Sequence, residues 1–383
     1  MKIAFIPSTF LPWVGGAEIQ THNTANKLEE LNHKVDIFLL KKEIIKNKKY
    51  KIIIFNKLLI NSIFLLKYYF YLDLTFVLQR YFEIILKKKK YDVWHFHSLN
   101  YKTLMYVRPL KNLQQKVHIT FQGADIQKDF KIKYGYRFDC KYENFLKKEI
   151  NLFDKIYSIS DNITKELSFF NVHKENIIKV PNSIEIKKIK YVGNSKKANF
   201  NNRLMIITVA RFYEKKKGLD LIPKIGEYLI KKNVDFNWTL IGRGSENLLK
   251  NSFIKKNNKH FSIHKEINNK NETYFPHSDL IKLYKKHNVY INLARIESFG
   301  ITIIEAIAAG LPIFTFNTKG ANEIVKDKIN GFIVKKYHSL DMANLIWKMI
   351  KNNYFNKPNK NINHINIYDL KLNTKILVKN YSL

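Results

Sequence analysis

Two glutamates, Glu297 and Glu305, bracket a short Ser-Phe-Gly turn at 298–300. The apolar run Ile303–Ala309 then predicts a buried helix, and Gly310 suits its left-handed C-terminal cap. The turn therefore lies at a helix N-terminus, where backbone N–H groups and the helix dipole favour an anion such as phosphate. Carboxylates repel phosphate but accept hydrogen bonds from sugar hydroxyls. Together these groups suit a nucleotide sugar, unless the glutamates only complement the dipole of their own helix.

A second group of charged residues follows another apolar run. Met205–Ala210 leads directly to Arg211, and Lys217 comes six residues later, just before Gly218 and an amphipathic stretch that predicts a helix. A strand-loop-helix turn would bring the arginine fork and the lysine point charge together, and both suit a diphosphate. Taken singly, each could equally be an ordinary surface cation.

Glycines mark two further turns. Gly15-Gly16 follows the first apolar run, and Gly242 opens a Gly-Arg-Gly sequence. Both positions permit close approach of the backbone to a phosphate or sugar, although a plain turn would look the same. The chain has no Gly-x-Gly-x-x-Gly sequence, which weighs against a nicotinamide or flavin enzyme.

Metal-binding patterns are weak. His95 and His97 lie two apart on one expected strand and hence on one face, but no third ligand is evident and most such histidines are structural. The chain also has no Asp-x-Asp sequence. We therefore expect no metal and no other cofactor, with cationic residues and a helix end neutralising a leaving diphosphate instead.

Together these motifs resemble those of the retaining glycosyltransferases of family 4. The resemblance rests on the Glu-x7-Glu pair with Ser-Phe-Gly, the Arg-x5-Lys-Gly element and Gly15-Gly16-Ala17-Glu18. Further matches follow in order along nearly the whole chain, at Tyr91–His97, Val180–Asn182, Leu240–Gly244, Thr318–Val325 and Asn330–Val334. The resemblance implies an α/β protein of the GT-B fold, with two Rossmann-like domains whose parallel sheets face a central cleft.

The resemblance also implies roles for individual residues. Glu305 would hold the ribose and Glu297 the transferred sugar, while Arg211 and Lys217 would hold the diphosphate, so that Glu297, Arg211 and Lys217 form the catalytic group. The remaining donor-binding positions would be Phe299, Gly300 and Ile301 through their backbone, Gly15 and Gly16 opposite them, and Gly242 on the nucleotide side.

Two residues are candidates for the acceptor side. The resemblance places His97 near the mouth of the cleft. Gln122 stands where many family members have a histidine before a glycine. A glutamine can accept and donate hydrogen bonds but cannot titrate, so Gln122 could not take a role that requires an imidazole.

The elements that must position these residues alternate between strand and helix. The first helix is expected from Ala17 to about Leu31, with Asn32 as a left-handed cap. Such alternation predicts parallel sheets covered on both faces, with ligands beyond the carboxyl ends of the strands. Short apolar runs predict strands at Lys2–Ile6, Lys34–Leu40, Lys51–Phe55, Asp92–Phe96, Lys116–Phe121, Lys155–Ile159, Ile177–Val180, Leu204–Val209, Phe236–Ile241, His260–His264, Asn288–Leu293, Pro312–Phe316 and Gly331–Val334.

The strands form two series, which predict two domains. The first, acceptor-side domain covers 1–183, and a polar stretch rich in Lys and Asn at 184–203 is the expected linker. The nucleotide-sugar-binding domain then covers 204–368. By resemblance, residues 369–383 return to the first domain as its last helix.

Length and composition agree with this organisation. With 383 residues and 45% hydrophobic content, the chain can form two cores and is too apolar for global disorder. The single cysteine, Cys140, excludes an intramolecular disulfide and fits a reducing compartment. The run Ile3–Ile6 is too short for a signal peptide. We therefore expect a cytoplasmic protein.

Net charge is +35, and both halves of the chain are basic. There are 31 basic and 17 acidic residues up to Ser183, and 36 basic and 15 acidic residues after it. Such a field attracts polyanions, whether nucleic acid, nucleotide sugars or anionic lipid. Charge alone does not choose among them.

The segment Leu58–Leu86 is apolar and aromatic, but Lys67, Asp73 and Arg80 interrupt it. It therefore lacks the roughly 20 uncharged residues that a membrane span requires. One interpretation is an interfacial helix or two, with Lys87–Lys90 on anionic headgroups. We favour the other interpretation, in which sheet-covering helices bury most of these side chains. Only a mixed aromatic and basic rim, Tyr68, Tyr69, Tyr71 and Lys87–Lys90, would then face a membrane.

The sequence thus predicts a metal-independent retaining glycosyltransferase. It would transfer a sugar from a nucleotide-diphosphate sugar, UDP- or GDP-linked, to a saccharide or lipid-linked acceptor in the synthesis of a bacterial surface polysaccharide such as lipopolysaccharide. The expected partners are donor, acceptor and the anionic inner face of the plasma membrane, and not nucleic acid. The alternatives are a nucleotide-sugar epimerase or phosphorylase on the same fold, or a basic nucleic-acid-binding protein, against which the carboxylates argue.

Overall fold

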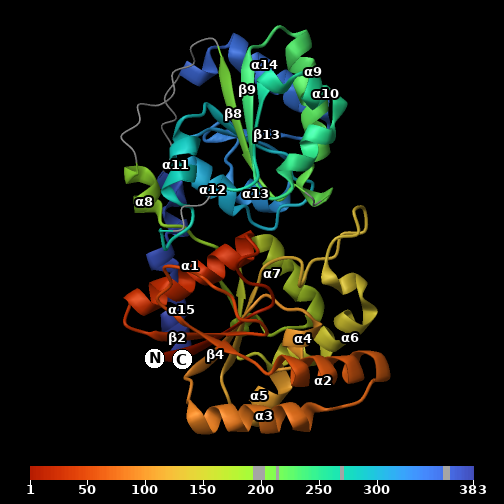
Figure 1. The fold of residues 1–383 in the computed structure, drawn as a ribbon, viewed down its shortest axis with the longest axis vertical. Coiled ribbons are helices and arrows are strands. Elements are labelled where there is room, and N and C mark those ends of the chain that lie inside the picture. The colour runs from red at the N-terminus through yellow and green to blue at the C-terminus, as the bar shows by residue number, and fades with distance from the viewer. Residues whose placement is uncertain (193–202, 213–214, 268–270, 357–362) are drawn as a thin grey trace. The chain divides into compact units, whose positions relative to one another are not determined.

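The computed structural model describes residues 1–192, 203–212, 215–267, 271–356 and 363–383. The chain divides into two compact units, each with one parallel sheet flanked by helices (Figure 1). The first unit comprises Met1–Asn182 and Leu370–Leu383, and the second comprises Ser183–Asp369. The predicted fold class, α/β with two parallel-sheet domains, is confirmed.

The sheet of the first unit has seven strands in the order β3-β2-β1-β4-β5-β6-β7, and each neighbouring pair is parallel. Its central strands are buried along their whole length, as expected where helices cover both faces of a parallel sheet. The strands are β1 (Lys2–Pro7), β2 (Lys34–Leu39), β3 (Lys51–Ile54), β4 (Val93–His97), β5 (Val117–Phe121), β6 (Lys155–Ser158) and β7 (Ile177–Lys179).

The helices of the first unit begin and end where local signals indicate. After α1, Asn32 adopts the left-handed conformation predicted for it, with φ of 61°. The side chain of Asn56 caps α2 by accepting from the Leu59 N–H at 3.1 Å. The α-helices are α1 (Gly16–Glu30), α2 (Lys57–Phe70), α3 (Thr75–Lys88), α4 (Tyr101–Leu104), α5 (Val107–Asn112), α6 (Cys140–Glu149), α7 (Asp161–Leu167) and α15 (Leu370–Tyr381), and short 3-10 turns are η1 (Tyr136–Phe138), η2 (Ile150–Leu152), η3 (Ser168–Phe170) and η4 (Lys174–Asn176).

The C-terminal helix α15 belongs to the first unit and packs against α1. Tyr381 near its end is buried, and its hydroxyl meets the Nδ1 atom of His95 in β4. The two chain termini lie side by side, with Ser382 Oγ at 3.8 Å from Met1 Sδ (Figure 1).

The sheet of the second unit has six strands in the order β10-β9-β8-β11-β12-β13, again parallel at each pairing. Its core includes Trp238 and Phe314, and α9 packs against α14. The strands are β8 (Leu204–Val209), β9 (Phe236–Ile241), β10 (Phe261–His264), β11 (Val289–Asn292), β12 (Ile313–Phe316) and β13 (Gly331–Val334).

The α-helices of the second unit are α8 (Ile186–Tyr191), α9 (Ile222–Lys231), α10 (Ser252–Lys256), α11 (Ser278–Lys285), α12 (Ile301–Ala308), α13 (Lys319–Ile324) and α14 (Ser339–Lys351). Short 3-10 turns are η5 (Lys215–Lys217), η6 (Leu219–Leu221), η7 (Ser245–Lys250), η8 (Asn258–His260), η9 (Tyr354–Asn356) and η10 (Asn363–Tyr368).

Part of the segment predicted as a linker, 184–203, is folded into the second unit. Ile184 pairs with Asp369, and α8 follows directly. The apolar side chains of Ile184, Ile186 and Ile189 are buried, a pattern that the surrounding lysines concealed in the sequence. The rest of the predicted linker, 193–202, lies outside the described residues.

The segment Leu58–Leu86 forms α2 and α3, but the expected burial of most of its side chains is not observed. Only Ile60 and Ile63 of α2, and Leu78 and Phe82 of α3, are buried. Each helix turns one narrow stripe inward and leaves the rest of its apolar side chains partly or fully exposed. None of the described helices combines the length and apolar character that crossing a bilayer requires.

Strand order reverses once in each sheet, between β1 and β4 and between β8 and β11. Loops that leave neighbouring strands in opposite directions open a crevice at such a point, beyond the carboxyl ends of the strands. These two switch points are therefore where the candidate site residues have to be sought.

Candidate functional site

Lys217 and Glu297 meet at the switch point of the second sheet. Lys217 lies in the loop after β8, and Glu297 lies in the loop after β11. The Lys217 Nζ is 2.9 Å from the Glu297 Oε2, although the two residues are 80 positions apart in sequence. Only 18% of the Lys217 side chain and 10% of the Glu297 side chain are exposed, so this ion pair is largely withdrawn from solvent.

A glycine allows the Lys217 loop to approach the neighbouring loop. Gly218 has φ of 66°, in the left-handed region that glycine favours. A Cβ atom at this position would lie 1.9 Å from the Tyr337 hydroxyl and 2.0 Å from the Leu293 carbonyl oxygen. The tight contact therefore requires glycine, and it fixes the position of Lys217 immediately before it.

Arg295 fastens the same two loops together. Its backbone N–H donates to the Lys216 carbonyl oxygen at 2.7 Å. Its guanidinium donates to both carboxylate oxygens of Asp220, each at 2.7 Å, and to the Lys215 carbonyl oxygen at 2.9 Å. The sequence did not predict these hydrogen bonds, because nothing local to Arg295 indicates a partner 75 positions away.

The turn between the two glutamates leads into the N-terminus of α12. Gly300 is the N-cap, with φ of 109°, and no side chain among the described residues caps this end. Phe299 and Ile301 are only 3% and 7% exposed, so their side chains belong to the interior. What the turn can offer a ligand is its backbone N–H groups and the positive end of the helix dipole.

The far end of α12 has the predicted cap. Gly310 has φ of 90°, and the N–H groups of Gly310 and Leu311 donate to the carbonyl oxygens of Ile307 and Ala306. This is the Schellman arrangement. The helix begins at Ile301, two residues earlier than the apolar run indicated.

Gly320 allows α13 to pack closely against the turn at 298–300. The Gly320 N–H donates to the Glu297 carbonyl oxygen at 3.0 Å, and a Cβ atom on Gly320 would lie 2.4 Å from that oxygen. Next to it, the Thr318 hydroxyl is buried and has no partner among the described residues. Thr318, to which the sequence assigned no role of its own, thus holds a buried hydroxyl two residues before the glycine that contacts the turn.

Glu305 lies inside α12 and is only 2% exposed. Tyr284 of α11 donates a hydrogen bond to its Oε2 atom at 2.9 Å. Burial raises the pKa of the Glu305 carboxyl to about 8, although the Tyr284 hydrogen bond and the charge of Lys188 act in the other direction. Tyr284 was also missed, because a buried tyrosine looks the same in sequence whether or not it holds a carboxylate.

Arg211 and Gly242 lie at the ends of β8 and β9. Arg211 is partly buried in the loop after β8, and Tyr213 and Glu214 of the same loop are outside the described residues. Gly242 has φ of 140°, and a Cβ atom there would lie 1.8 Å from the Ala210 carbonyl oxygen. Close packing of the two strand ends is therefore sufficient to require glycine at position 242.

In the first unit, the expected glycine turn follows β1 at the other switch point. Gly15 is the N-cap of α1 in an extended conformation, with φ of −154°, and Gly16 is the first residue of the helix. The Thr9 hydroxyl donates to the buried carboxylate of Glu18 in the first turn of α1 at 2.5 Å. The loop after β1 is thereby held against the start of α1.

His97 ends β4, and its side chain is enclosed. It is 3% exposed, its ring centroid is 4.2 Å from that of Phe5, and neither ring nitrogen has a partner among the described residues. Burial lowers the pKa of the His97 imidazole to about 3, so the ring is neutral. The imidazole of His97 therefore does not face solvent.

Gln122 follows β5, the strand next to β4, and is held on two sides. Its side-chain amide exchanges hydrogen bonds with that of Asn182, at 2.9 and 3.3 Å. Its backbone N–H donates to the buried carboxylate of Asp125 at 3.1 Å. Asp125, which sequence reasoning did not assign, also accepts from the N–H groups of Gly123 and Leu99 and so ties the ends of β4 and β5 together.

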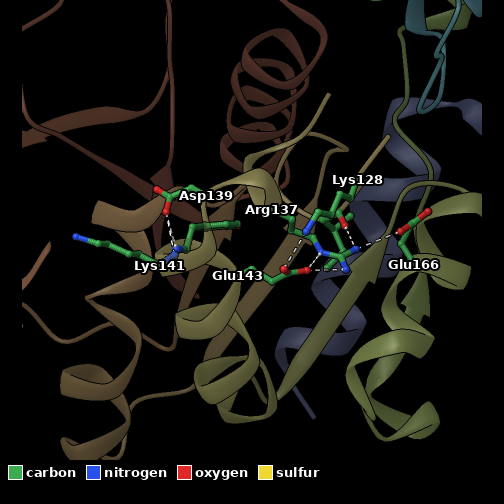
Figure 2. A network of polar contacts seen from close by, with 8 residues as sticks. Lys128, Arg137, Asp139, Lys141, Glu143 and Glu166 are labelled. Atoms are coloured by element: carbon green, nitrogen blue, oxygen red, sulfur yellow. Dashed lines mark hydrogen bonds and ion pairs between the residues drawn. The ribbon is translucent and has the colours of Figure 1, made fainter. Parts of the chain in front are cut away.

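Charged side chains hold the longer loop that runs from Gln122 to α6. Arg137 lies between Glu143 and Glu166 (Figure 2). Its guanidinium nitrogens are 2.9 Å from the Glu143 Oε1 and 3.4 Å from the Glu166 Oε2, and the Lys128 Nζ is 3.0 Å from the Glu143 Oε2. Arg137 also donates to the Ile126 carbonyl oxygen at 2.9 Å. The loop is therefore fastened to α6 and α7.

Among the described residues, no three His, Cys, Asp or Glu side chains lie close enough to share a metal ion. The polar groups that the loops after β8 and β11 bring together are the Lys217–Glu297 pair, the Arg295–Asp220 pair and the uncapped N-terminus of α12.

Two protein-family models match the chain. The model described as "Glycosyltransferase Family 4" matches residues 14–188, and the one described as "Glycosyl transferases group 1" matches residues 194–365. Together they cover both units of the structure.

Curated relatives include an uncharacterized glycosyltransferase of Haemophilus influenzae, 27% identical over 52% of this chain and 52% of that protein. The uncharacterized glycosyltransferase MJ1178 of Methanocaldococcus jannaschii is 25% identical over 93% of this chain and 90% of its own length. The capsular polysaccharide biosynthesis glycosyltransferase CapM of Staphylococcus aureus is 28% identical over 51% of this chain and 52% of its own. The similarity thus spans about half of two of these relatives and nearly all of the third.

Solved structures share the fold. A glycosyltransferase from Rickettsia africae superposes with a TM-score of 0.75 at 18% identity, covering 100% of this chain and 97% of that one. HepE of Anabaena, solved with UDP-glucose, superposes with a TM-score of 0.71 at 16% identity and covers 100% of both chains. These neighbours identify the architecture as GT-B.

Proposed function

Because the chain belongs to the family 4 glycosyltransferases, we propose that it transfers a sugar, with retention of configuration, from a UDP- or GDP-sugar to a saccharide or lipid-linked acceptor. HepE, which shares the fold, was solved with UDP-glucose, and this supports a nucleotide-sugar donor. CapM acts in capsular polysaccharide synthesis, and this supports a bacterial surface polysaccharide as the product. The net charge of +35 supports an acceptor at an anionic surface, for which we propose the inner face of the plasma membrane.

The observation that carries the proposal is the Lys217–Glu297 pair beside the N-terminus of α12. The Lys217 ammonium suits the phosphate groups of a nucleotide sugar, and the Glu297 carboxylate suits its sugar hydroxyls. Lys217 would exchange the carboxylate for phosphate oxygens, and Glu297 would exchange the ammonium for sugar hydroxyls. Neither side chain would then be left unpaired on donor binding, so the cost of separating them is offset.

Glu305 fits the ribose of such a donor. Tyr284 holds one of its oxygens, and this fixes the direction in which the carboxyl group can bond. A carboxyl group that is mostly protonated near neutral pH can still accept from one ribose hydroxyl and donate to another. Glu305 would thus bind the ribose without placing a full negative charge next to the diphosphate.

Arg211 and the backbone of Gly300 and Ile301 would complete the diphosphate site. Negative charge builds up on the diphosphate as the sugar departs, and fixed cations and helix N–H groups stabilise that charge in the transition state. This is the role that a metal ion has in other transferases, and we propose that this enzyme works without one. With no separate nucleophile assigned, the acceptor hydroxyl would attack on the face from which the diphosphate leaves.

A donor screen tests the proposal. A ligand that binds the native state raises the melting temperature, by an amount that grows with its concentration relative to its Kd. We expect UDP- or GDP-sugars to stabilise the protein and the free monosaccharides not to do so. If no nucleotide sugar, UDP or GDP shifts the melting temperature at millimolar concentration, the proposed donor class is wrong. NMR analysis of the product anomer then tests retention.

A further inference from the structure

We propose that the end of α2 and its connection to α3 form a docking surface that inserts into an anionic lipid bilayer. The inference deepens the proposed function, because it names how the enzyme reaches a lipid-linked acceptor, and it rests on that proposal for this purpose alone. The docking surface comprises Leu65, Leu66, Tyr69, Phe70, Tyr71, Leu72 and Phe76.

The first observation is how little of α2 is used for packing. All but a few of its residues are apolar or aromatic, yet among its 14 residues only Ile60 and Ile63 are buried. Over the docking surface the exposed fractions include 69% for Phe70, 75% for Tyr71 and 66% for Phe76. Large apolar side chains exposed this closely together indicate a surface that is covered in the working protein.

The second observation is that the connection is held in one conformation. Tyr71 has φ of 58°, a left-handed conformation that bulky residues adopt only where other contacts impose it. Its N–H donates to the Leu66 carbonyl oxygen, and the following turn is fixed by Asp73, which accepts from both the N–H and the hydroxyl of Thr75. The exposed rings are therefore presented by a built turn.

Lys141 of α6 holds the base of this turn. Its Nζ donates to the Tyr68 carbonyl oxygen at 2.8 Å and lies 4.6 and 4.8 Å from the ring centroids of Tyr68 and Tyr71. Tyr68 in turn donates to Asp139, the N-cap of α6, at 2.7 Å. Asp139 and Lys141 are at the start of α6. In Figure 2 they lie to the left of the charged cluster formed by Lys128, Arg137, Glu143 and Glu166.

The third observation is the charge around the docking surface. Lys67 lies over the Phe145 ring at 4.9 Å and pairs with Asp73 at 3.5 Å, and Lys102 lies over the Phe64 ring at 4.7 Å. Lys141 lies over the Tyr68 and Tyr71 rings, and Lys147 and Lys148, in the last turn of the same helix, are exposed. Lysines that surround aromatic and aliphatic side chains are typical of segments that bury rings at the lipid boundary and place ammonium groups among anionic headgroups.

This charge decides between the possible occupants. A second copy of the chain would bring two lysine-rich surfaces together, and like charges at an interface oppose association. An anionic bilayer supplies both the apolar interior and the complementary charge. The bilayer is therefore the occupant that the docking surface fits.

The rim expected from the sequence, Tyr68, Tyr69 and Tyr71 with Lys87–Lys90, falls on two separate places. The three tyrosines lie at the end of α2, and Lys87–Lys90 lie at the opposite end of α3, about 20 Å of helix away from the connection. Lys89 there pairs with Asp36 at 3.3 Å, whereas Lys87, Lys88 and Lys90 are exposed. Because the large exposed apolar side chains gather at the connection, we place the centre of the proposed contact at 70–76.

The test is sedimentation of the full-length protein with vesicles, without donor or acceptor. We compare phosphatidylcholine vesicles with vesicles in which about a third of the lipid is phosphatidylglycerol, and then raise the salt concentration. Electrostatic attraction to headgroups weakens once its reach falls below about 10 Å, near 0.1 M salt. We expect binding to the anionic vesicles only, with release as salt rises.

The key variant is Phe70→Ser/Phe76→Ser, and its matched control is Phe130→Ser/Phe169→Ser. All four phenylalanines are in the first unit and are 66–74% exposed, so neither variant removes a core side chain. We expect the first variant to lose at least tenfold in vesicle binding and the control to stay within twofold. Equal binding by both variants would overturn the proposal, as would wild-type binding that does not depend on anionic lipid.

A second measurement leaves the docking surface intact. Cys140 is the single cysteine, it is exposed, and it lies next to Lys141. A polarity-sensitive dye on Cys140 should shift to shorter wavelength with anionic vesicles and not with phosphatidylcholine alone. An unchanged spectrum, or a salt-resistant dimer that Phe70→Ser/Phe76→Ser dissociates, would contradict the membrane assignment. Transfer to a soluble acceptor should be equal in both variants, which separates failure of docking from failure of the proposed activity.

Discussion

Lys217→Ala should have two effects that can be separated by a second substitution. The first is loss of a charge-assisted contact with the donor diphosphate. The second is that Glu297, with only 10% of its side chain exposed, is left without its cation. Glu297→Gln removes the unpaired charge, because an amide does not need a counter-charge. It does not restore the lost contact with the diphosphate.

The expected magnitudes differ for the two effects. A hydrogen bond to a charged group contributes about 1.5–3 kcal/mol, which corresponds to a donor Kd raised roughly 10- to 150-fold. Breaking a fully buried ion pair costs about 3–5 kcal/mol, and because 18% of Lys217 is exposed we expect a smaller loss of unfolding free energy, about 1–3 kcal/mol. The double variant should recover most of the stability and none of the donor affinity.

Chemical denaturation and calorimetric titration with UDP or GDP measure the two quantities. Lys215→Ala is the matched control, since the Lys215 side chain is exposed and lies in the same loop. The reasoning is refuted if the double variant regains donor affinity, because Lys217 would then serve only to neutralise Glu297. It is also refuted if Lys217→Ala binds the nucleotide as tightly as Lys215→Ala does.

Three further predictions follow from the same site. Arg211→Ala should raise the donor KM at least tenfold with an unchanged fold, measured by steady-state kinetics and circular dichroism; unchanged kinetics would remove Arg211 from the site. Glu305 has a folded-state pKa raised to about 8, above its value in the unfolded chain, so its contribution to stability is complete at low pH and is lost as pH rises towards 8. Glu305→Gln should therefore gain stability relative to the wild type between pH 5 and pH 8 in denaturant titrations, and it should raise the donor KM; a pH-independent difference would contradict the buried, protonated carboxyl. EDTA should leave transfer activity unchanged, whereas its abolition, with recovery on adding magnesium or manganese, would show that a metal takes part.

Local sequence signals were sufficient for most of the fold. Each predicted strand occurs, with both ends within one residue of the prediction, because short β-branched runs between polar turns have few other ways to bury themselves. Asn32 and Gly310 adopt the left-handed conformations assigned to them. Both predictions depended on residues adjacent in sequence, where the geometry of a cap is decided.

Long-range contacts were not predictable in the same way. Arg295 with Asp220, and Tyr284 with Glu305, are brought together only by the order of the strands and helices. The residues next to each partner in the sequence do not indicate these contacts. The exposure of α2 was missed for a related reason, since an apolar segment looks the same in sequence whether a protein core or a membrane covers it.

The candidate site was partly accessible from sequence. Lys217 and Glu297 were assigned to one ligand, and the structure places their side chains 2.9 Å apart. The family resemblance made His97 a candidate for the acceptor side, and the structure shows its ring buried beside Phe5. The direction of a side chain at the end of a strand depends on which face its helices cover, which the motif alone does not specify.

The most direct test of the central claim is to incubate the purified protein with UDP- and GDP-sugars and a lipid-linked acceptor, and to analyse the products by mass spectrometry. We predict an acceptor heavier by one sugar, released together with UDP or GDP, and no such product from Lys217→Ala at low donor concentration. An epimerised donor, a sugar phosphate or free sugar as the main product would contradict the assignment as a glycosyltransferase acting through this site.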